Sequence, residues 1–238
     1  LSGAFGDDVI TGGELGETNG DTLNASALTG DISLLLNDAE AGTLTQGTNE
    51  ATFSEIETVI LGTGDDNVTG SAGNDTVATN TGADTVDMGA GNDTVDLGLL
   101  DSAVDTVVFS DGDGDDVLFN FETPIDNGDG TFTGRDQLDV SGLHDTNGAQ
   151  VNTSDVTVTD TVGDGSGDAV LQFPNGETIT LIGVSVSEVS SPEQLAAMGI
   201  PAPDYTVEGT AGDDIIDSFY VADPEGDMID DNDAADGS

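Results

Sequence analysis

Large apolar residues recur at a fixed nine-residue step through the middle of the chain. Valine occupies positions 68, 77, 86 and 95, with a polar residue before each one and six glycine-rich residues between successive three-residue units. One apolar residue between two outward-facing neighbours is the pattern of a short, half-buried β-strand. A strand and a turn repeated at so short a period predict an all-β solenoid, with valine inside.

The polar positions between the valines keep the same register. In the frame G-G-x-G-x-D-x-U-x, with U a large apolar residue, Gly62 and Gly89 stand second, and the fourth and sixth positions are Gly64, Gly73, Gly82 and Gly91, then Asp66, Asp75, Asp84 and Asp93. This nonapeptide is typical of calcium-binding β-helices. Two nonapeptides should make one coil, which stacks aspartates 18 residues apart. Such stacked charges need a cation between the loops, where backbone carbonyls complete the six to eight oxygen ligands of Ca²⁺.

Composition supports a cation as the natural partner. The 238 residues hold 49 acids, 37 of them Asp, against one base, so the formal net charge is −48. Such a chain repels nucleic acid and anionic membranes, and without a counterion it should be largely disordered. Cysteine is absent, so no disulfide can staple the fold, and no apolar run approaches the length of a membrane span. We interpret the chain, which opens at Leu1, as a piece of a longer one.

These residues resemble the hemolysin-type calcium-binding repeats of the RTX family, which form a parallel β-roll. The match is gapless over 61–96 and looser to 143, where the candidate ligands are Asp105, Gly112, Gly114, Asp116 and Asp136. The resemblance implies export through a type I secretion channel and folding at millimolar calcium outside the cell. It also leaves an alternative open. The chain would then be the accessory and secretion segment of a larger exported enzyme, or of a protein with a Hint domain.

Both ends of the chain repeat the theme with insertions. Asp8 and Asp21 near the start, and Asp214 and Asp227 near the end, are each 13 residues apart. We expect N-terminal roll coils over 1–28, a roll over 61–143 and the start of a further roll over 204–238. Ends so alike suggest head-to-tail self-association into extracellular filaments.

Two segments lack the repeat. Residues 29–60 predict two or three strands that bulge from the roll. Residues 144–203 predict an antiparallel cap with turns at 163–168 and 174–177, and a short helix over 192–198. Ser191 is the expected N-cap of this helix, Gln194 completes a capping box and Gly199 is the expected C-cap. The fold expected is therefore a calcium-bound parallel β-roll with an antiparallel cap and one helix.

No known catalytic motif is present, so we predict that the chain is not an enzyme. The stretch 111–122 fits an EF-hand loop in part, but Asp116 replaces the required glycine and its flanks are not helical. His144 is expected in a solvated loop, and Arg135 beside neighbouring acids. Thr76, Thr85 and Thr94 are expected to form one short outward row, interrupted at Asn67, which is a poor basis for ice binding. Few aromatic residues are available for an adhesive pocket.

Overall fold

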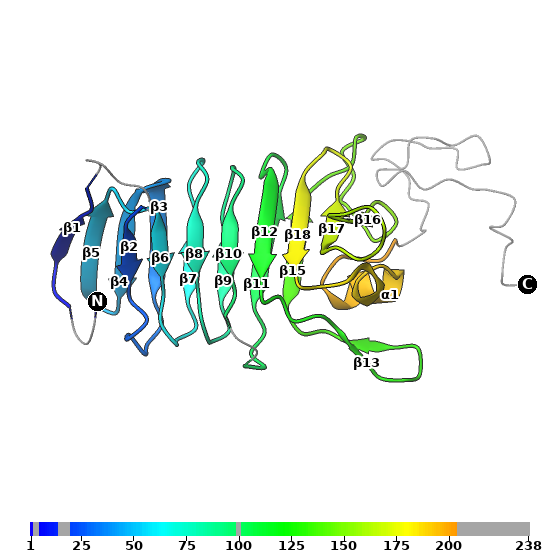
Figure 1. Ribbon diagram of the computed structural model, residues 1–238, viewed down its shortest axis with the longest axis horizontal. Helices are drawn as coiled ribbons and strands as arrows, with labels where there is room; N and C mark the ends of the chain where they lie inside the picture. Colours follow the sequence, from blue (N-terminus) through cyan, green and yellow to red (C-terminus); the bar gives the residue numbers. More distant parts are fainter. Residues whose placement is uncertain (2–4, 14–19, 99–100, 204–238) are drawn as a thin grey trace, which may run out of the picture.

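The computed structural model describes residues 1, 5–13, 20–98 and 101–203 of the chain. Over this range the chain winds into two sheets of eight strands that face each other across an apolar interior. The strands stand side by side along the long axis, from β1 at one end to the helix α1 at the other (Figure 1). The predicted all-β roll is therefore confirmed.

Successive strands of the repeat alternate between the two sheets. In spatial order the first sheet contains β1 (Asp8–Thr11), β5 (Asn49–Ser54), β4 (Ala41–Gln46), β3 (Ser33–Asp38), β7 (Asn67–Thr69), β9 (Thr85–Asp87), β11 (Thr106–Ser110) and β15 (Gln137–Gly142). The second contains β16 (Thr157–Asp160), β17 (Ala169–Gln172), β18 (Thr178–Ile182), β12 (Asp115–Phe119), β10 (Thr94–Asp96), β8 (Thr76–Ala78), β6 (Thr58–Ile60) and β2 (Thr22–Asn24). Two nonapeptides therefore make one coil.

The apolar residue of each repeat fills the space between the sheets. On the first sheet Val86 pairs in register with Val68 on one side and with Val107 on the other. On the second sheet Val77 pairs with Val95. All five side chains are buried, while the residues on either side of each face outward or are half-buried. The one-in, two-out pattern of the sequence therefore becomes the core of the roll.

Three strands of the segment expected to bulge from the roll lie within its first sheet instead, and β6 lies in the second. Strands β3, β4 and β5 pair antiparallel with one another, β3 pairs parallel with β7, and β5 pairs parallel with β1. Leu34, Leu44 and Phe53 carry the apolar interior through this part. The prediction of a bulge was wrong, because alternating apolar residues let these strands bury one face by extending the sheet.

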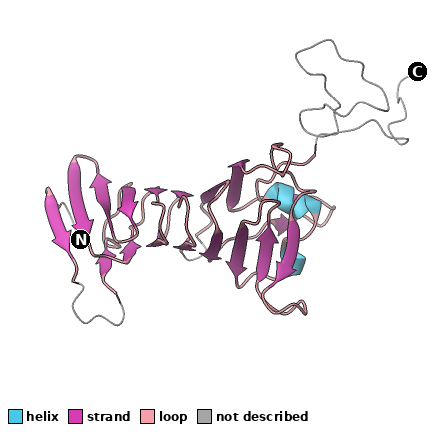
Figure 2. Cartoon of the chain, turned by 90° about the horizontal axis from the view of Figure 1, so that it is seen from above, coloured by secondary structure: helices cyan, strands magenta, loops and turns pink. Residues whose placement is uncertain are grey.

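The C-terminal part covers the last coil. Strand β18 pairs parallel with β12, and β17 and β16 continue the second sheet antiparallel. The 3₁₀ helix η1 (Val186–Glu188) and α1 (Pro192–Ala197) lie at this end (Figure 2). The Met198 carbonyl accepts a hydrogen bond from the Leu138 N–H at 2.6 Å, so the end of α1 satisfies the edge strand β15.

The cap of α1 follows the sequence except at its C-terminal residue. The Ser191 side chain accepts a hydrogen bond from the Gln194 N–H, and Gln194 completes the capping box. Met198 is the C-cap in place of the expected Gly199, which follows it at φ 100°.

The two-residue strands β13 (Ile125–Asp126) and β14 (Phe132–Thr133) form a hairpin that the repeat frame did not predict. No helix among the described residues is long and apolar enough to cross a membrane.

Candidate metal sites

The aspartates at the sixth repeat position form two stacks, one at the start of each row of strands. Asp66, Asp84, Asp105 and Asp136 precede β7, β9, β11 and β15, and Asp75, Asp93 and Asp116 precede or open β8, β10 and β12. Asp105 stacks on Asp84 although 21 residues separate them, because β11 pairs with β9 in the regular register. The frame that stretches beyond residue 96 in sequence is thus restored in space.

A hydrogen bond joins each aspartate to the one on the next coil. The Asp66 N–H donates to Oδ1 of Asp84 at 2.7 Å, and the Asp84 N–H donates to Oδ1 of Asp105 at 2.9 Å. The same bond repeats from Asp105 to Asp136, from Asp75 to Asp93 and from Asp93 to Asp116. In every stacked aspartate except Asp75, one carboxylate oxygen therefore bonds to the preceding coil, and the second oxygen is a separate acceptor.

That second oxygen is unsatisfied in three of the aspartates. Oδ2 of Asp66, Asp84 and Asp93 is buried and, within the described part of the chain, has no hydrogen-bond partner. Each of the three side chains is at most 2% exposed. A buried charged oxygen without a donor is costly, and the usual remedies are protonation or a bound cation.

Two other candidate ligands have their oxygens satisfied by the protein. Asp75 accepts hydrogen bonds from the N–H and the hydroxyl of Ser71, at 2.7 and 3.2 Å. Asp136 accepts the Asp105 N–H at Oδ1 and the Glu122 N–H at Oδ2. The repeat frame treats all of these positions alike, whereas the fold gives them different needs for a cation.

Burial raises the pKa of the stacked carboxyls. It raises the pKa of Asp66, Asp105 and Asp116 to about 7 each, and negative charge on a stacked neighbour adds to the effect. It raises the pKa of Asp93 to about 6, again with a neighbour's charge contributing. The pKa of Asp84 is also raised by burial. The ionised form of these carboxyls is therefore disfavoured near neutral pH unless a positive charge lies beside them.

The glycines of the frame allow adjacent turns to touch. At Gly82 the backbone has φ 135°, and a Cβ would lie 2.1 Å from the Gly64 carbonyl oxygen. At Gly91 φ is 149°, and a Cβ would lie 2.5 Å from the Gly73 oxygen. Because no side chain separates the turns, the backbone of each turn packs directly on the carbonyls of the adjacent turn. No three carboxylate or imidazole groups of the described residues converge on one point, so an ion here would need such carbonyls as ligands.

The predicted ligands at the chain ends lie in different surroundings. Asp8 is exposed, and Asp21 is half-buried and accepts the Gly13 N–H at 2.7 Å. Asp214 and Asp227 lie outside the described residues, as does the predicted further roll.

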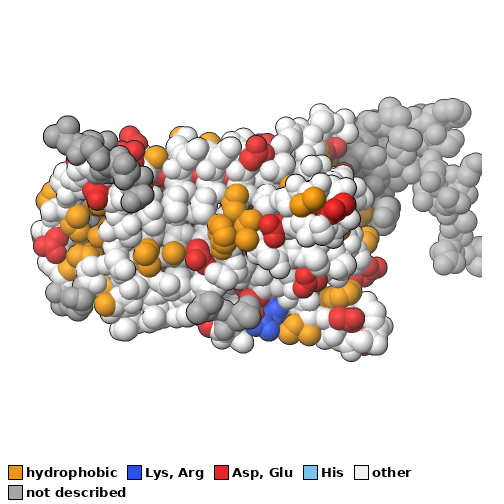
Figure 3. Space-filling view, in the orientation of Figure 1, with side chains coloured by type: hydrophobic (Ala, Val, Ile, Leu, Met, Phe, Trp, Pro, Cys, Tyr) orange, Lys and Arg blue, Asp and Glu red, His pale blue; other side chains and the backbone are white. Residues whose placement is uncertain are grey.

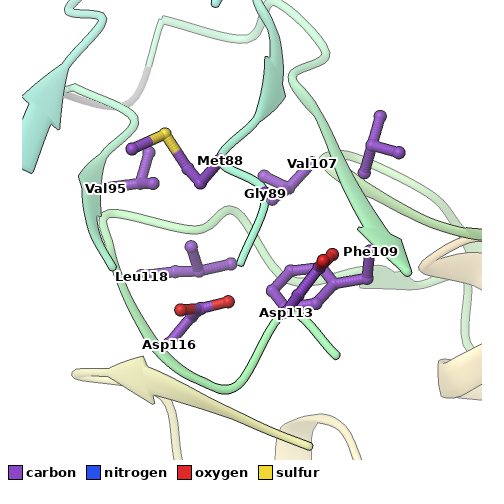
Figure 4. Close-up of a pocket in the computed structure, with 9 residues that line it drawn as sticks. Met88, Gly89, Val95, Val107, Phe109, Asp113, Asp116 and Leu118 are labelled. Atoms are coloured by element: carbon purple, nitrogen blue, oxygen red, sulfur yellow. The ribbon is translucent and has the colours of Figure 1, made fainter. Parts of the chain in front are cut away.

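Two buried acids were missed by the sequence reasoning. Asp113 and Glu177 are 6% and 8% exposed. Asp113 lines a cavity of about 10 Å³ with Asp116, and Figure 4 shows both of their side chains across from Met88 and Val95. Asp113 stands third in its repeat, and Glu177 falls in a predicted turn, so neither occupies a ligand position of the frame. The adjacent Asp-Gly pairs of 111–116 were the only signal for Asp113.

The remaining polar candidates are accounted for by local contacts. Arg135 forms an ion pair with Glu122, and His144 Nδ1 lies 2.9 Å from Oδ2 of Asp111. Figure 3 shows one small blue patch on a surface scattered with acids. The stretch 111–122 is not an EF-hand loop, because β11 precedes it and β12 lies within it, with no helix on either side.

The prediction of a single row of outward-facing threonines was wrong. Thr76 and Thr94 are neighbours on the second sheet, whereas Thr85 lies on the first, between Asn67 and Thr106. Because successive repeats alternate between the sheets, residues nine apart face opposite sides of the roll.

The two facing sheets, whose repeat strands pair in parallel, and the stacked aspartates define a parallel β-roll. The model of the RTX calcium-binding nonapeptide repeat matches residues 1–14 and 60–95 of the chain, with four copies. No curated protein matches the sequence significantly.

Two solved structures are similar to parts of this chain. The extracellular lipase LipA from Serratia marcescens is 19% identical, and the alignment covers 80% of this chain and 34% of the lipase, with a TM-score of 0.29. The AlgE6R3 subunit of the mannuronan C5-epimerase from Azotobacter vinelandii is 16% identical, with 90% and 96% covered and a TM-score of 0.31. This chain thus spans about a third of the lipase.

Proposed function

We propose that the chain is a non-catalytic structural β-roll that binds several calcium ions in its turns and folds when it does so. The observation that carries the proposal is the set of buried, unpartnered carboxylate oxygens of Asp66, Asp84 and Asp93. These oxygens belong to stacks in which glycine turns pack directly on one another, so backbone carbonyls of those turns would supply the further ligands. A hard cation that prefers six to eight oxygen ligands suits this combination.

The charge of the chain favours the same conclusion. With 49 acids and one base, the folded roll concentrates negative charge that only bound cations can offset. The sites require two coils in register, so the unfolded chain offers no equivalent, and the free energy of binding becomes free energy of folding. The stacked aspartates and the repeat glycines would hold the ions, and the apolar row would supply the core.

Circular dichroism with calcium titrated in and then removed tests this proposal. We expect little β-structure in chelator, a cooperative gain as calcium rises into the millimolar range, and loss on chelation. Magnesium should substitute poorly, because it prefers a small octahedral shell and keeps its water. A β-sheet spectrum that persists unchanged in chelator would refute the proposal.

We further propose that the roll works outside the cell, as part of a secreted or surface protein. Sites that need millimolar calcium would stay empty in a cytosol that holds little free calcium, so the chain would remain unfolded until export. The alternative remains an accessory segment of an exported enzyme or Hint-domain protein. The sequence that flanks this segment distinguishes the two.

Head-to-tail assembly also stays a proposal. Among the described residues β1 and β2 are the last strands of the two sheets at one end of the roll, and Val9 on β1 is 82% exposed. Open edges can pair with another copy and extend into filaments. Electron microscopy with calcium should show fibres that dissolve on chelation, whereas uniform monomers at high concentration would exclude assembly.

A further inference from the structure

Asp113 and Glu177 meet where the roll joins its cap. Asp113 lies in the turn between β11 and β12, and Glu177 immediately precedes β18 in the cap. Strand β18 pairs in parallel with β12, and the Thr178 N–H donates to the Gly114 carbonyl at 3.0 Å. The Gly112 N–H donates to Oε1 of Glu177 at 3.0 Å, so Glu177 is held directly against the turn that carries Asp113.

The two carboxylates are buried without a positive partner. Oε2 of Glu177 is fully buried and, among the described residues, has no hydrogen-bond partner, and Oδ2 of Asp113 accepts only the Ser110 N–H, at 2.6 Å, among the bonds found there. Burial raises the pKa of Asp113, and negative charge on Asp87, Glu177 and Asp111 raises it further. The only Arg of the chain pairs with Glu122, and the only His lies beside Asp111.

The stack of repeat aspartates ends at this point. Asp116 pairs with Ile179 of β18, so the next coil supplies an apolar residue where the repeat would supply a carboxylate. Glu177, two residues before Ile179, is the acid that the cap brings to the last turn instead. It does so from outside the nonapeptide frame, and across the junction between two structurally different parts of the chain.

We propose that Asp113 and Glu177 together hold a divalent cation, calcium in the chain's setting, that fastens the cap to the last coil of the roll. The choice of calcium rests on the proposed function. The location rests on the buried Glu177 oxygen and on the contacts across the β11–β12 turn. The two side chains offer carboxylate oxygens as ligands, which suits a hard cation such as calcium better than zinc.

The test is calcium binding by the full 238-residue chain, measured by isothermal titration calorimetry, with thermal unfolding at saturating calcium. Glu177→Gln keeps the shape and the Gly112 hydrogen bond but removes the charge. We expect one fewer bound ion, or one site weakened by at least about tenfold, and a lower unfolding temperature. Asp113→Asn should lose the same ion, and the double variant should lose no second one.

A rise of the unfolding temperature in Glu177→Gln, in place of the expected fall, would overturn the proposal. If no ion binds there, neutralising a buried, unpaired carboxylate should raise the unfolding temperature and leave the ion count unchanged. Glu193→Gln, an exposed position on α1, is the matched control and should change neither quantity. The Glu177→Gln variant should still fold on calcium, because the repeat sites are unchanged. If the unmodified chain does not depend on calcium for folding, the proposed function is wrong, and not only this site.

Discussion

At the scale of single residues, the two carboxylate oxygens of a stacked aspartate such as Asp84 have different surroundings. Oδ1 accepts the peptide N–H of the preceding coil, as Asp84 does from Asp66, and this bond exists without a metal. Oδ2 of Asp84 has no partner among the residues that the structure describes. The first oxygen specifies register, and the second creates the demand for a cation.

Asp84→Asn should therefore weaken calcium-driven folding far more than Asp155→Asn. The amide can keep the Oδ1 bond but removes the charge at Oδ2, and we expect the calcium midpoint to rise about tenfold. Asp155 in the cap is only half-buried and accepts the Asn152 N–H at 2.9 Å. Equal midpoints for the two variants, followed by circular dichroism, would contradict the stacked arrangement.

The raised pKa values predict opposite pH dependences with and without calcium. A carboxyl whose pKa rises from about 3.9 in the unfolded chain to about 7 at Asp66 or Asp116 stabilises the metal-free fold below the unfolded value. That stability is lost as pH rises towards 7. Residual β-structure in chelator should thus be greatest near pH 4.

Calcium competes with those protons for the same oxygens. The calcium midpoint should therefore fall as pH rises from 5 to 8, in a calorimetric or dichroism titration. A midpoint that is flat across this range would show that the buried carboxyls are not ligands.

At the scale of elements, short strands and glycine turns depend on one another. A strand of three residues contributes one buried side chain, so each coil is stable only when its neighbours stack on it. Turns can stack at strand spacing only where no Cβ intervenes. At Gly98 a Cβ would lie 1.6 Å from the Asn80 carbonyl oxygen, whereas at Gly130 in the β13–β14 hairpin nothing lies within 4 Å.

Gly98→Ala and Gly130→Ala form a matched pair, because φ is 89° at both glycines. Both variants incur the left-handed backbone cost of about 1 to 2 kcal/mol, but only Gly98→Ala forces two coils apart. We expect thermal unfolding at saturating calcium to fall by a few degrees for Gly130→Ala and by about 10 °C or more for Gly98→Ala. Similar shifts would mean that the turns can separate without loss.

At the scale of the whole molecule, the roll is an elongated stack with one end covered. Sheet pairing continues from β2 through β12 into the cap strands, and the end of α1 bonds to β15 at the edge of the first sheet. Polar surface and a charge of −48 keep the molecule soluble but oppose its compact state. Bound calcium should offset this repulsion and favour the compact state.

Small-angle X-ray scattering should register the change in size directly. A compact chain of this length has a radius of gyration of about 20 Å, and an unfolded one about 50 Å. We expect chelator to expand the chain towards the larger value and calcium to restore the smaller one. A radius that stays constant through chelation and calcium return would show that cations are not needed for compaction.

The sequence alone determined the parts of this protein that depend on local chemistry and on period. The nine-residue step set the inward valines, the glycine turns and the stacking of Asp66 on Asp84, because each coil repeats the same backbone path. The capping box of α1 was equally readable, since its bonds join residues three apart.

Only the tertiary structure decided what depends on contacts between distant segments. Strands β3, β4 and β5 join the first sheet because the neighbouring strands offer hydrogen bonds, which no local pattern predicts. Asp75 and Asp93 occupy the same position of the repeat. Ser71 donates hydrogen bonds to the carboxylate of Asp75, whereas Oδ2 of Asp93 has no hydrogen-bond partner among the described residues. Glu177 meets Asp113 from 64 residues away in sequence, because β18 pairs with β12 and carries its buried charge to the last turn of the roll.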